Sequence, residues 1–201
     1  MKLNDLQLDA LAELINIGCG KAAGAMSQMT QSSVDLCAPE ITVLDECRLA
    51  AYAESFSGAA CDVTALDFSG ALAGQALLLL LKESADNLVA LLTQGMHPDR
   101  ASPGMREDAL RETANVVLIW IASAMANALG HSLDYSPLRY GSSLEDMLPK
   151  VCDPGSSALL IKAGFSLRHK LVNGDILFLF PAQEFIRLLE AVDRLISKAR
   201  Q

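Results

Sequence analysis

Two sets of three polar side chains share one spacing in this sequence, at positions i, i+4 and i+7. They are Asp9, Glu13 and Asn16 in the first set and Asp108, Glu112 and Asn115 in the second. On an α-helix this spacing places each set within about 60° on one face, so each set would form a polar stripe. A carboxylate accepts hydrogen bonds, and a carboxamide both donates and accepts them. Each stripe could therefore bind a polar group or orient a water molecule.

A polar stripe also has a simpler interpretation. A single stripe on an amphipathic helix is usually a solvated face, and a duplicated helix can keep its polar side without forming a site. Asparagine, however, is a poor choice for a solvated position inside a helix, because its side chain competes with the backbone for hydrogen bonds. Asn16 and Asn115 occupy matched places in the two stripes, which indicates a role beyond solubility.

The stripes must be carried by two long helices. Asn4 followed by Gln7 predicts a capping box at the start of the first helix, which we expect to run to about residue 29. Pro103 after a serine predicts the start of the second helix, which we expect to end near residue 129. The apolar run 116–129 contains Ser123 and Asn127 and is too short and too polar for a membrane span, which favours a buried helix.

The remaining elements follow the same order in the two halves of the chain. The expected strands are 34–36, 41–44, 62–68 and 71–81 in the first half and 133–140, 158–167 and 171–180 in the second. Each half is expected to close with a helix, at 84–94 and at 182–198. A short helix at 144–150 has no equally clear counterpart in the first half.

The two halves also match residue by residue. Gly74 and Gly174 lie 100 residues apart and begin similar strands, GQALLLLL and GDILFLFP. We therefore expect one domain made of two halves, about 1–95 and 103–201, joined by a polar linker at 95–104. Short turns between successive strands predict an α+β fold: a pseudo-twofold, duplicated α/β sandwich with two long helices packed on a mostly antiparallel sheet.

Composition excludes several classes of protein. Hydrophobic residues make up 51% of the 201 residues and charged residues 20%, as expected of a globular chain. A net charge of −8 argues against binding to nucleic acid, whose phosphates are neutralised by Lys and Arg. The five cysteines and three histidines show no metal-ligand spacing, and the cysteines form no recognisable disulfide framework. Reduced thiols and the lack of a secretory signal predict a cytoplasmic protein.

A family resemblance rests on the stripes and on the prolines that follow them. Twenty-two residues separate Asn16 from Pro39, and 21 residues separate Asn115 from Pro137. The pattern Asp, Glu, Asn and then Pro resembles the signature of the CheC/CheX/FliY phosphatases, here in two copies. The segments ELINIGCGKAAGAMSQM and ETANVVLIWIASAMANAL are similar to that family's two long helices. The resemblance covers nearly the whole chain.

The resemblance implies a phosphatase that dephosphorylates a phosphorylated CheY-like response regulator. That partner already holds an aspartyl phosphate, a Lys and a Mg²⁺ ion, so no cofactor is expected on this chain. The resemblance implies that Asn16 and Asn115 position the attacking water. Glu13 and Glu112 would pair with the regulator's Lys. The reaction needs positioning and electrostatics more than a nucleophile on this chain.

The remaining roles are also implied by the resemblance. Asp9 and Asp108 would contact the partner's surface, while Pro39 and Pro137 would shape the strand that follows. A second partner could be the adaptor CheD, and the segment 144–152 is a candidate for its binding because the halves differ there. We expect a monomer or a weak homodimer.

Two further points stay open in the sequence. Ile119 stands where the first half has Gly20, so the two sites are expected to be unequal. The main alternative to a phosphatase is a non-catalytic protein of the same fold. It would be either an adaptor that binds a response regulator or CheD, or a component similar to those of the flagellar switch.

Overall fold

The structure is a computed structural model of the 201-residue chain. It describes residues 3–31, 33–93, 103–128, 130, 132–148, 157–167 and 170–199. Most of the expected linker at 95–104 lies outside the described residues, as do residues 149–152 of the expected CheD-binding segment.

Six helices are present in the described residues. They are α1 (Asp5–Thr30), α2 (Glu46–Glu54), α3 (Lys82–Leu92), α4 (Pro103–Ala128), α5 (Leu144–Met147) and α6 (Ala182–Ala199). The expected capping box at α1 is confirmed: the Gln7 amide donates to Asn4 Oδ1 over 2.9 Å, and the Asn4 amide donates to Gln7 Oε1 over 3.1 Å. These bonds satisfy two backbone N–H groups that a helix start would otherwise leave unpaired, which fixes where α1 begins.

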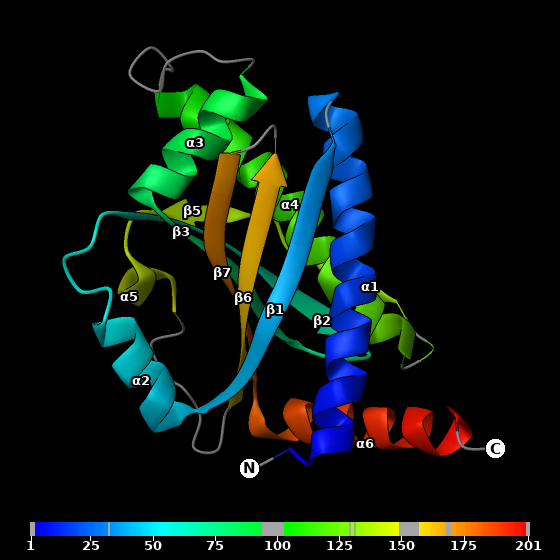
Figure 1. Ribbon diagram of the computed structural model, residues 1–201. Helices are drawn as coiled ribbons and strands as arrows, with labels where there is room; N and C mark the ends of the chain where they lie inside the picture. The colour runs from blue at the N-terminus through cyan, green and yellow to red at the C-terminus, as the bar shows by residue number, and fades with distance from the viewer. Residues whose placement is uncertain are drawn as a thin grey trace.

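The strands form one sheet in which every pair is antiparallel. They are β1 (Val34–Asp45), β2 (Cys61–Gly70), β3 (Gly74–Leu81), β4 (Leu133–Tyr135), β5 (Arg139–Gly141), β6 (Ser157–Leu167) and β7 (Lys170–Phe180). The order is β1-β6-β7-β3-β2-β4, and β5 also pairs with β2. The expected α+β fold with a mostly antiparallel sheet is confirmed (Figure 1).

The centre of the sheet joins the two halves of the sequence. β3 pairs with β7, and Leu77 lies directly opposite Leu177, which is 100 residues further along the chain. β2 and β6 flank this central pair as the hairpin partners of β3 and β7. The local twofold relation of the sheet therefore passes through the β3–β7 pair. The outer strands are exchanged between the halves, because β1 of the first half pairs with β6 of the second, and β4 and β5 of the second half pair with β2 of the first.

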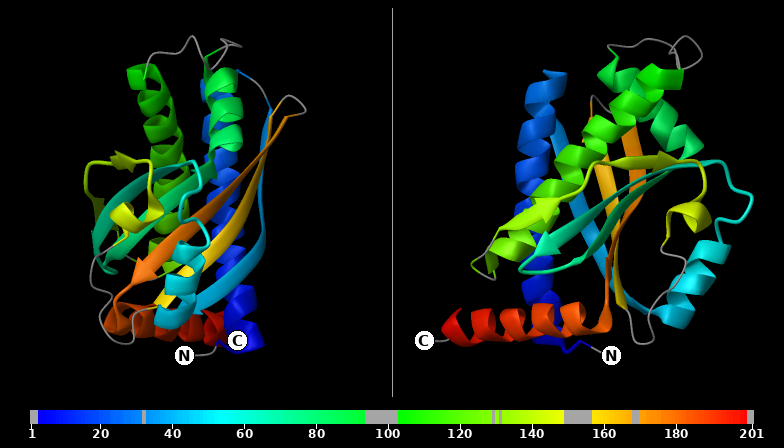
Figure 2. Two further views of the ribbon diagram at one scale, coloured as in Figure 1. Left: turned by 90° about the vertical axis from the view of Figure 1, so that its left-hand side faces the viewer. Right: turned by 180° about the vertical axis from the view of Figure 1, so that it is seen from behind.

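Helices cover both faces of this sheet. Along β3, Ala76, Leu78 and Leu80 belong to a large core beneath α1, α3, α4 and α6. Leu77 and Leu79 point to the other face, where a smaller core lies beneath α2 and α5. A strand buried on both faces has an almost continuous apolar sequence, and this explains the run of leucines. Figure 2 shows α1 and α4 side by side, and Figure 1 shows α6 crossing the end of the sheet.

One helix was not anticipated from the sequence. α2 follows β1 in the first half as α5 follows β5 in the second. α2 is therefore the counterpart of α5 that the sequence did not show. Asp45 caps α2 by accepting a hydrogen bond from the Arg48 amide, but only Leu49 and Ala53 are buried within it. Two buried residues in nine give too weak a helical periodicity to be recognised in the sequence.

Three strand boundaries also differ from expectation. The pieces 34–36 and 41–44 belong to one strand, β1, whose register shifts between Cys37 and Glu40. The strand expected at 133–140 is divided into β4 and β5, with Pro137 between them, because proline supplies no N–H for a strand ladder. β3 begins at Gly74, three residues later than expected.

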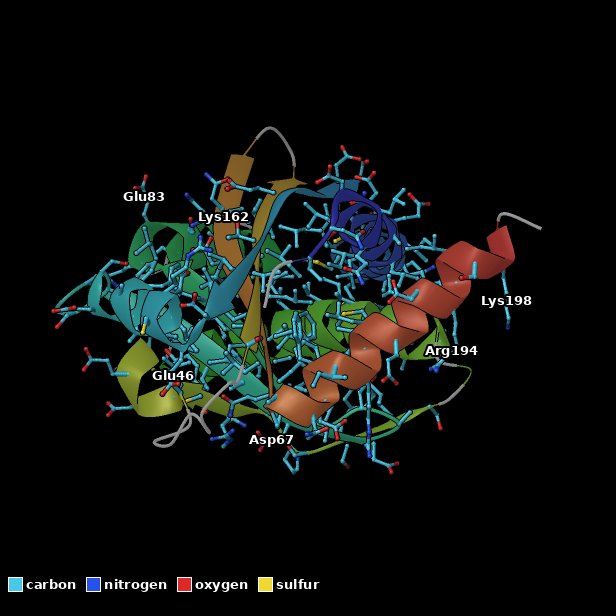
Figure 3. The ribbon with its side chains drawn as sticks, turned by 90° about the horizontal axis from the view of Figure 1, so that it is seen from below. Glu46, Asp67, Glu83, Lys162, Arg194 and Lys198 are labelled. Atoms are coloured by element: carbon cyan, nitrogen blue, oxygen red, sulfur yellow. The ribbon has the colours of Figure 1, made fainter. Side chains whose placement is uncertain are left out.

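α4 has the length and apolar composition of a membrane-spanning helix, with a mean hydropathy of 1.2 over its most apolar window. In the fold, 56% of that window is buried, as is expected of a helix that packs in a protein core. The side of α4 that faces the sheet explains its composition without a membrane. In contrast to α4, the helix α6 carries charged side chains on its outer side, among them Arg194 and Lys198 (Figure 3).

Candidate functional site

The two polar stripes lie on the outer sides of α1 and α4. Asp9, Glu13 and Asn16 are exposed in α1, and in α4 Asp108 and Glu112 are exposed while Asn115 is half-buried. The buried residues of the same helix segments lie about 180° around each axis from the stripes. They are Leu11, Ile15, Gly18 and Ala22 in α1 and Leu110, Ala114, Val117 and Ile121 in α4. Burial of these residues therefore turns both stripes towards solvent.

A close contact between α1 and α4 sets the relative position of the stripes. A Cβ atom added to Gly18 would lie 2.6 Å from the Ile121 Cα and 3.0 Å from the Trp120 carbonyl oxygen. The absence of a side chain at Gly18 thus allows the two backbones to approach at this point. The helices run in opposite directions, so the two stripes extend away from the contact towards opposite ends of the pair (Figure 2).

The surroundings of the two stripes differ at one matched position. No atom lies within 4 Å of a Cβ added to Gly20, so the α1 backbone is open to a partner there. Ile119, at the matched position in α4, is half-buried against the large core. The geometry at this position is therefore unequal in the two halves, and unequal activity remains a prediction.

Arg111 is a second difference between the halves. Its side chain donates to Glu107 Oε1 over 2.8 Å and to the Leu138 carbonyl oxygen over 2.8 Å, which ties α4 to the segment that follows Pro137. The matched residue in α1 is Ala12, which has no polar side chain. The sequence analysis did not identify Arg111. A comparison of matched positions in the two halves would have shown that an arginine stands opposite an alanine there.

Lys21 and Trp120 also occupy matched positions, 99 residues apart, and they touch. The Lys21 Nζ lies 5.6 Å from the centre of the Trp120 ring, within the range of a cation–π interaction. Trp120 is 37% exposed, and Ile17, which follows Asn16, is 44% exposed. Large apolar side chains therefore border the stripes on the outer surface of the helix pair.

The two prolines of the pattern lie in strand segments and not in the stripes. Pro39 is within β1 at the shift of register between Cys37 and Glu40, and exposed Pro137 lies between β4 and β5. Both positions interrupt a regular ladder, where a residue without an N–H is tolerated. That they shape the strand that follows stays a prediction.

The open geometry of the stripes limits the chemistry they can support. Two cavities of about 290 and 490 Å³ lie beside α5 and beside β1, and their walls contain no stripe residue. Among the described residues, no group of three or more His, Cys, Asp or Glu side chains is arranged to hold a metal ion. An exposed carboxylate and carboxamide on a convex helix surface are suited to entering the site of another macromolecule.

Comparison with known proteins agrees with this geometry. Residues 6–43 match the model of the CheC-like family. The flagellar motor switch phosphatase FliY of Bacillus subtilis is 26% identical over 189 residues, which cover 89% of this chain and 47% of that protein. The putative CheY-P phosphatase CheC1 of Halobacterium salinarum is 26% identical over 191 residues, which cover 92% of this chain and 96% of that protein. This chain thus spans about half the length of the Bacillus protein.

Solved structures share the fold at lower sequence identity. Thermotoga maritima FliY matches with a TM-score of 0.75 and 16% identity, covering 96% of this chain and 99% of that one. The FliM middle domain of Helicobacter pylori matches with a TM-score of 0.69 and 10% identity, covering 94% of this chain and 99% of that one.

These comparisons confirm the resemblance to the CheC/CheX/FliY phosphatases that the two stripes and their prolines indicated. The matched family segment contains the whole first stripe and Pro39, while the two homologues extend the match across both halves. The chain carries a CheC-like segment at residues 6–43, is homologous to the FliY and CheC1 phosphatases over about nine-tenths of its length, and has the fold of Thermotoga FliY.

Proposed function

We propose that this chain is a protein phosphatase that hydrolyses the aspartyl phosphate of a CheY-like response regulator, in chemotaxis or related two-component signalling. The observation that carries the proposal is the exposure of two matched Asp, Glu and Asn stripes on neighbouring helices. The printed names of the two homologues, a motor switch phosphatase and a putative CheY-P phosphatase, support the same activity. A CheX protein of Borrelia burgdorferi that shares the fold, with a TM-score of 0.51, was solved in complex with CheY.

The proposed reaction needs a water molecule held in line with the phosphorus atom. Phosphoryl transfer depends mainly on positioning and on electrostatic stabilisation. The carboxamide of Asn16 or Asn115 would accept a hydrogen bond from the water and leave an oxygen lone pair directed at the phosphorus. The regulator supplies the Mg²⁺ ion and the Lys that neutralise the phosphoryl oxygens. This chain contributes the water's orientation.

The carboxylates would secure the carboxamide in the partner's site. Glu13 and Glu112 lie three residues before each asparagine, so a Glu side chain and the Asn side chain can enter the site together. A charge-assisted hydrogen bond from Glu to the regulator's Lys would fix the depth of insertion. Asp9 and Asp108, about one turn earlier, would contact the rim of the regulator's site.

Location and further partners belong to the same proposal. We place the protein in the cytoplasm, where response regulators act, and expect a monomer or a weak homodimer. CheD is a proposed second partner, with a binding site that includes α5. Glu145 and Asp146 are exposed on α5, which has four residues where its counterpart α2 has nine.

A second function is favoured by one observation. FliM domains of the flagellar switch share the fold, and the FliM of a FliG–FliM complex from H. pylori matches with a TM-score of 0.69. A non-catalytic switch-like component would bind a regulator through the same stripes without hydrolysing its phosphate.

The decisive experiment measures loss of phosphate from a phosphorylated CheY-like regulator of the same organism, with and without this protein. We expect the protein to accelerate the loss and the Asn16→Ala/Asn115→Ala double variant to reduce the acceleration roughly 10-fold or more, because the water is no longer positioned. Gln28→Ala/Asn127→Ala is the matched control. Gln28 and Asn127 are exposed and 99 residues apart on the same helices, about 18 Å beyond the asparagines.

Each outcome separates the two functions. Acceleration that the control retains and the double variant loses supports the phosphatase. Binding of the phosphorylated regulator without acceleration, by both wild type and control, supports the switch-like component and removes the catalytic role of the asparagines.

A further inference from the structure

The helix that closes each half of the chain contacts the stripe-bearing helix of the other half. α3 belongs to the first half, and its Asp86 forms an ion pair with Arg106 in the first turn of α4. α6 belongs to the second half, and its Asp193 accepts a hydrogen bond from Gln7 Nε2 in the first turn of α1 over 2.9 Å. Each stripe is therefore supported by an element from the opposite half.

Gln7 and Arg106 occupy the same place in the repeat. They are 99 residues apart, and each precedes the first acid of its stripe by two residues, Asp9 in α1 and Asp108 in α4. A separation of two residues places them about 160° around the helix from those acids. Each side chain thus holds its helix from behind, on the side away from the partner.

The contact on α4 is the more extensive of the two. Arg106 also pairs with Asp62 of β2, with 2.6 Å between Nη2 and Oδ2, and Asp62 in turn accepts a hydrogen bond from Tyr140 of β5. The Asp62 side chain is 9% exposed and that of Arg106 is 19% exposed. Gln7 is uncharged, and its Oε1 is used by the capping box.

The Arg106 pairs are charged and largely shielded from water. Burial lowers the pKa of Arg106, but its hydrogen bonds and the charges of Asp62 and Asp86 outweigh burial and raise the pKa, so the guanidinium stays ionised. Ion pairs that are shielded from water hold their geometry better than exposed pairs.

We propose that Arg106 and Gln7 are positioning residues, through which Asp86 of α3 and Asp193 of α6 set the orientation of the stripe in the opposite half. This inference rests on the proposed phosphatase activity. A catalytic group has to be held within about 0.5 Å and 10–20° of its working geometry. Loss of either contact lets the first turns of one long helix tilt or rotate, which moves one Glu and one Asn and leaves the other pair in place.

The test uses two variants that each retain one stripe. Asn16→Ala retains the second stripe and Asn115→Ala retains the first. We combine each with Asp86→Ala or with Asp193→Ala and measure kcat and KM for dephosphorylation of the regulator. Asp86 and Asp193 lie at or near the surface, so their removal leaves the cores intact.

Each aspartate variant is expected to lower the kcat of the stripe in the opposite half and to spare the stripe in its own half. Asp86→Ala lowers kcat about 3- to 10-fold when only the second stripe remains, and less than about 2-fold when only the first remains. Asp193→Ala does the opposite. KM changes less than kcat in each case, because most of the docking surface is retained. Asp86→Glu restores the carboxylate and recovers at least half of the lost kcat.

Lys82→Ala is the matched control on α3. Lys82 is an exposed partner of Asp86, with 3.7 Å between Nζ and Oδ1, and this ion pair lies within α3. We expect this variant to leave kcat unchanged with either stripe. A general loss of stability would instead lower the activity of both stripes for Asp86→Ala and Asp193→Ala alike, and equal losses would overturn the proposal.

Amide hydrogen exchange gives a readout that does not depend on activity. Asp86→Ala should accelerate exchange at 103–110 in α4 and not at 5–11 in α1, and Asp193→Ala should do the reverse. If the wild type shows no phosphatase activity, the proposed function fails and exchange alone decides whether the cross-half contacts hold the helices. Unchanged exchange in both segments would contradict the inference whatever the activity.

Discussion

At the scale of single residues, Asp62 connects three elements by hydrogen bonds. Its carboxylate accepts from Arg106 of α4 and from the hydroxyl of Tyr140 in β5. Burial of Tyr140, followed by its hydrogen bond to Asp62 and the negative charge of Asp62, raises the pKa of Tyr140 to about 12. The half-buried hydroxyl of Tyr140 thus stays protonated at pH values above the ordinary pKa of tyrosine.

This shift predicts how stability depends on pH. The pKa of Tyr140 is higher in the folded state than in the unfolded state, so its contribution is complete below pH 10 and is lost as pH rises from 10 to 12. Tyr140→Phe removes that loss, which we expect to be about 1 kcal/mol after allowance for screening by solvent. Urea unfolding of both proteins from pH 8 to 12 measures it, and parallel curves for the two would contradict it.

At the scale of elements, the packing of α1 on α4 depends on the lack of a side chain at one position. Gly18 lies at the crossing, where an added Cβ would meet backbone atoms of α4. Gly20 lies two residues further along the same helix, exposed and with no atom within 4 Å of an added Cβ. The same residue type therefore has different surroundings on opposite sides of one helical turn.

Alanine at the two glycines should therefore have different effects. Gly18→Ala forces α1 and α4 apart, and we expect a loss of about 1–3 kcal/mol in the free energy of unfolding despite the gain in helix propensity. Gly20→Ala keeps that gain without a clash, and we expect stability to be unchanged or to rise by up to about 1 kcal/mol. Urea denaturation of the pair measures both, and equal shifts would disprove the close contact.

At the scale of the whole molecule, the two halves share one sheet and one large core. The β3–β7 pair joins them at Leu77 and Leu177, and both leucines are fully buried. Residues of α1 and α4 belong to the same buried cluster as residues of α3 and α6. Neither half buries its apolar surface without the other, so the halves should unfold together.

Cooperative unfolding can be tested with the single tryptophan. Trp120 lies in α4, so its fluorescence reports on the second half, while far-UV circular dichroism reports on the whole chain. Leu77→Ala in the first half should lower stability by about 2–5 kcal/mol and shift both signals by the same amount. The second-half variant Leu177→Ala should behave in the same way. A fluorescence midpoint that stays constant in Leu77→Ala would mean that the halves unfold separately.

Local structure, and the helix face that each stripe occupies, could be predicted from the amino-acid sequence. The capping box of Asn4 and Gln7 predicted where α1 starts, and Pro103 predicted the start of α4. The spacing of Asp9, Glu13 and Asn16 was enough to place them together, because a helix of known pitch converts spacing directly into direction. The repeat of Gly74 and Gly174 indicated a duplicated sheet, because similar sequences in the two halves are expected to form similar strands.

Contacts between side chains from distant segments could be seen only in the folded molecule. Nothing in the sequence distinguishes Arg106 from other charged helix residues, yet it pairs with Asp62, 44 residues away. Gln7 and Asp193 are 186 residues apart, and their contact exists because α6 packs against the start of α1. Such pairs depend on how whole elements pack against each other, and periodicity carries no information about this. The stripes could be found in the sequence, and the residues that hold them in place could be found only in the fold.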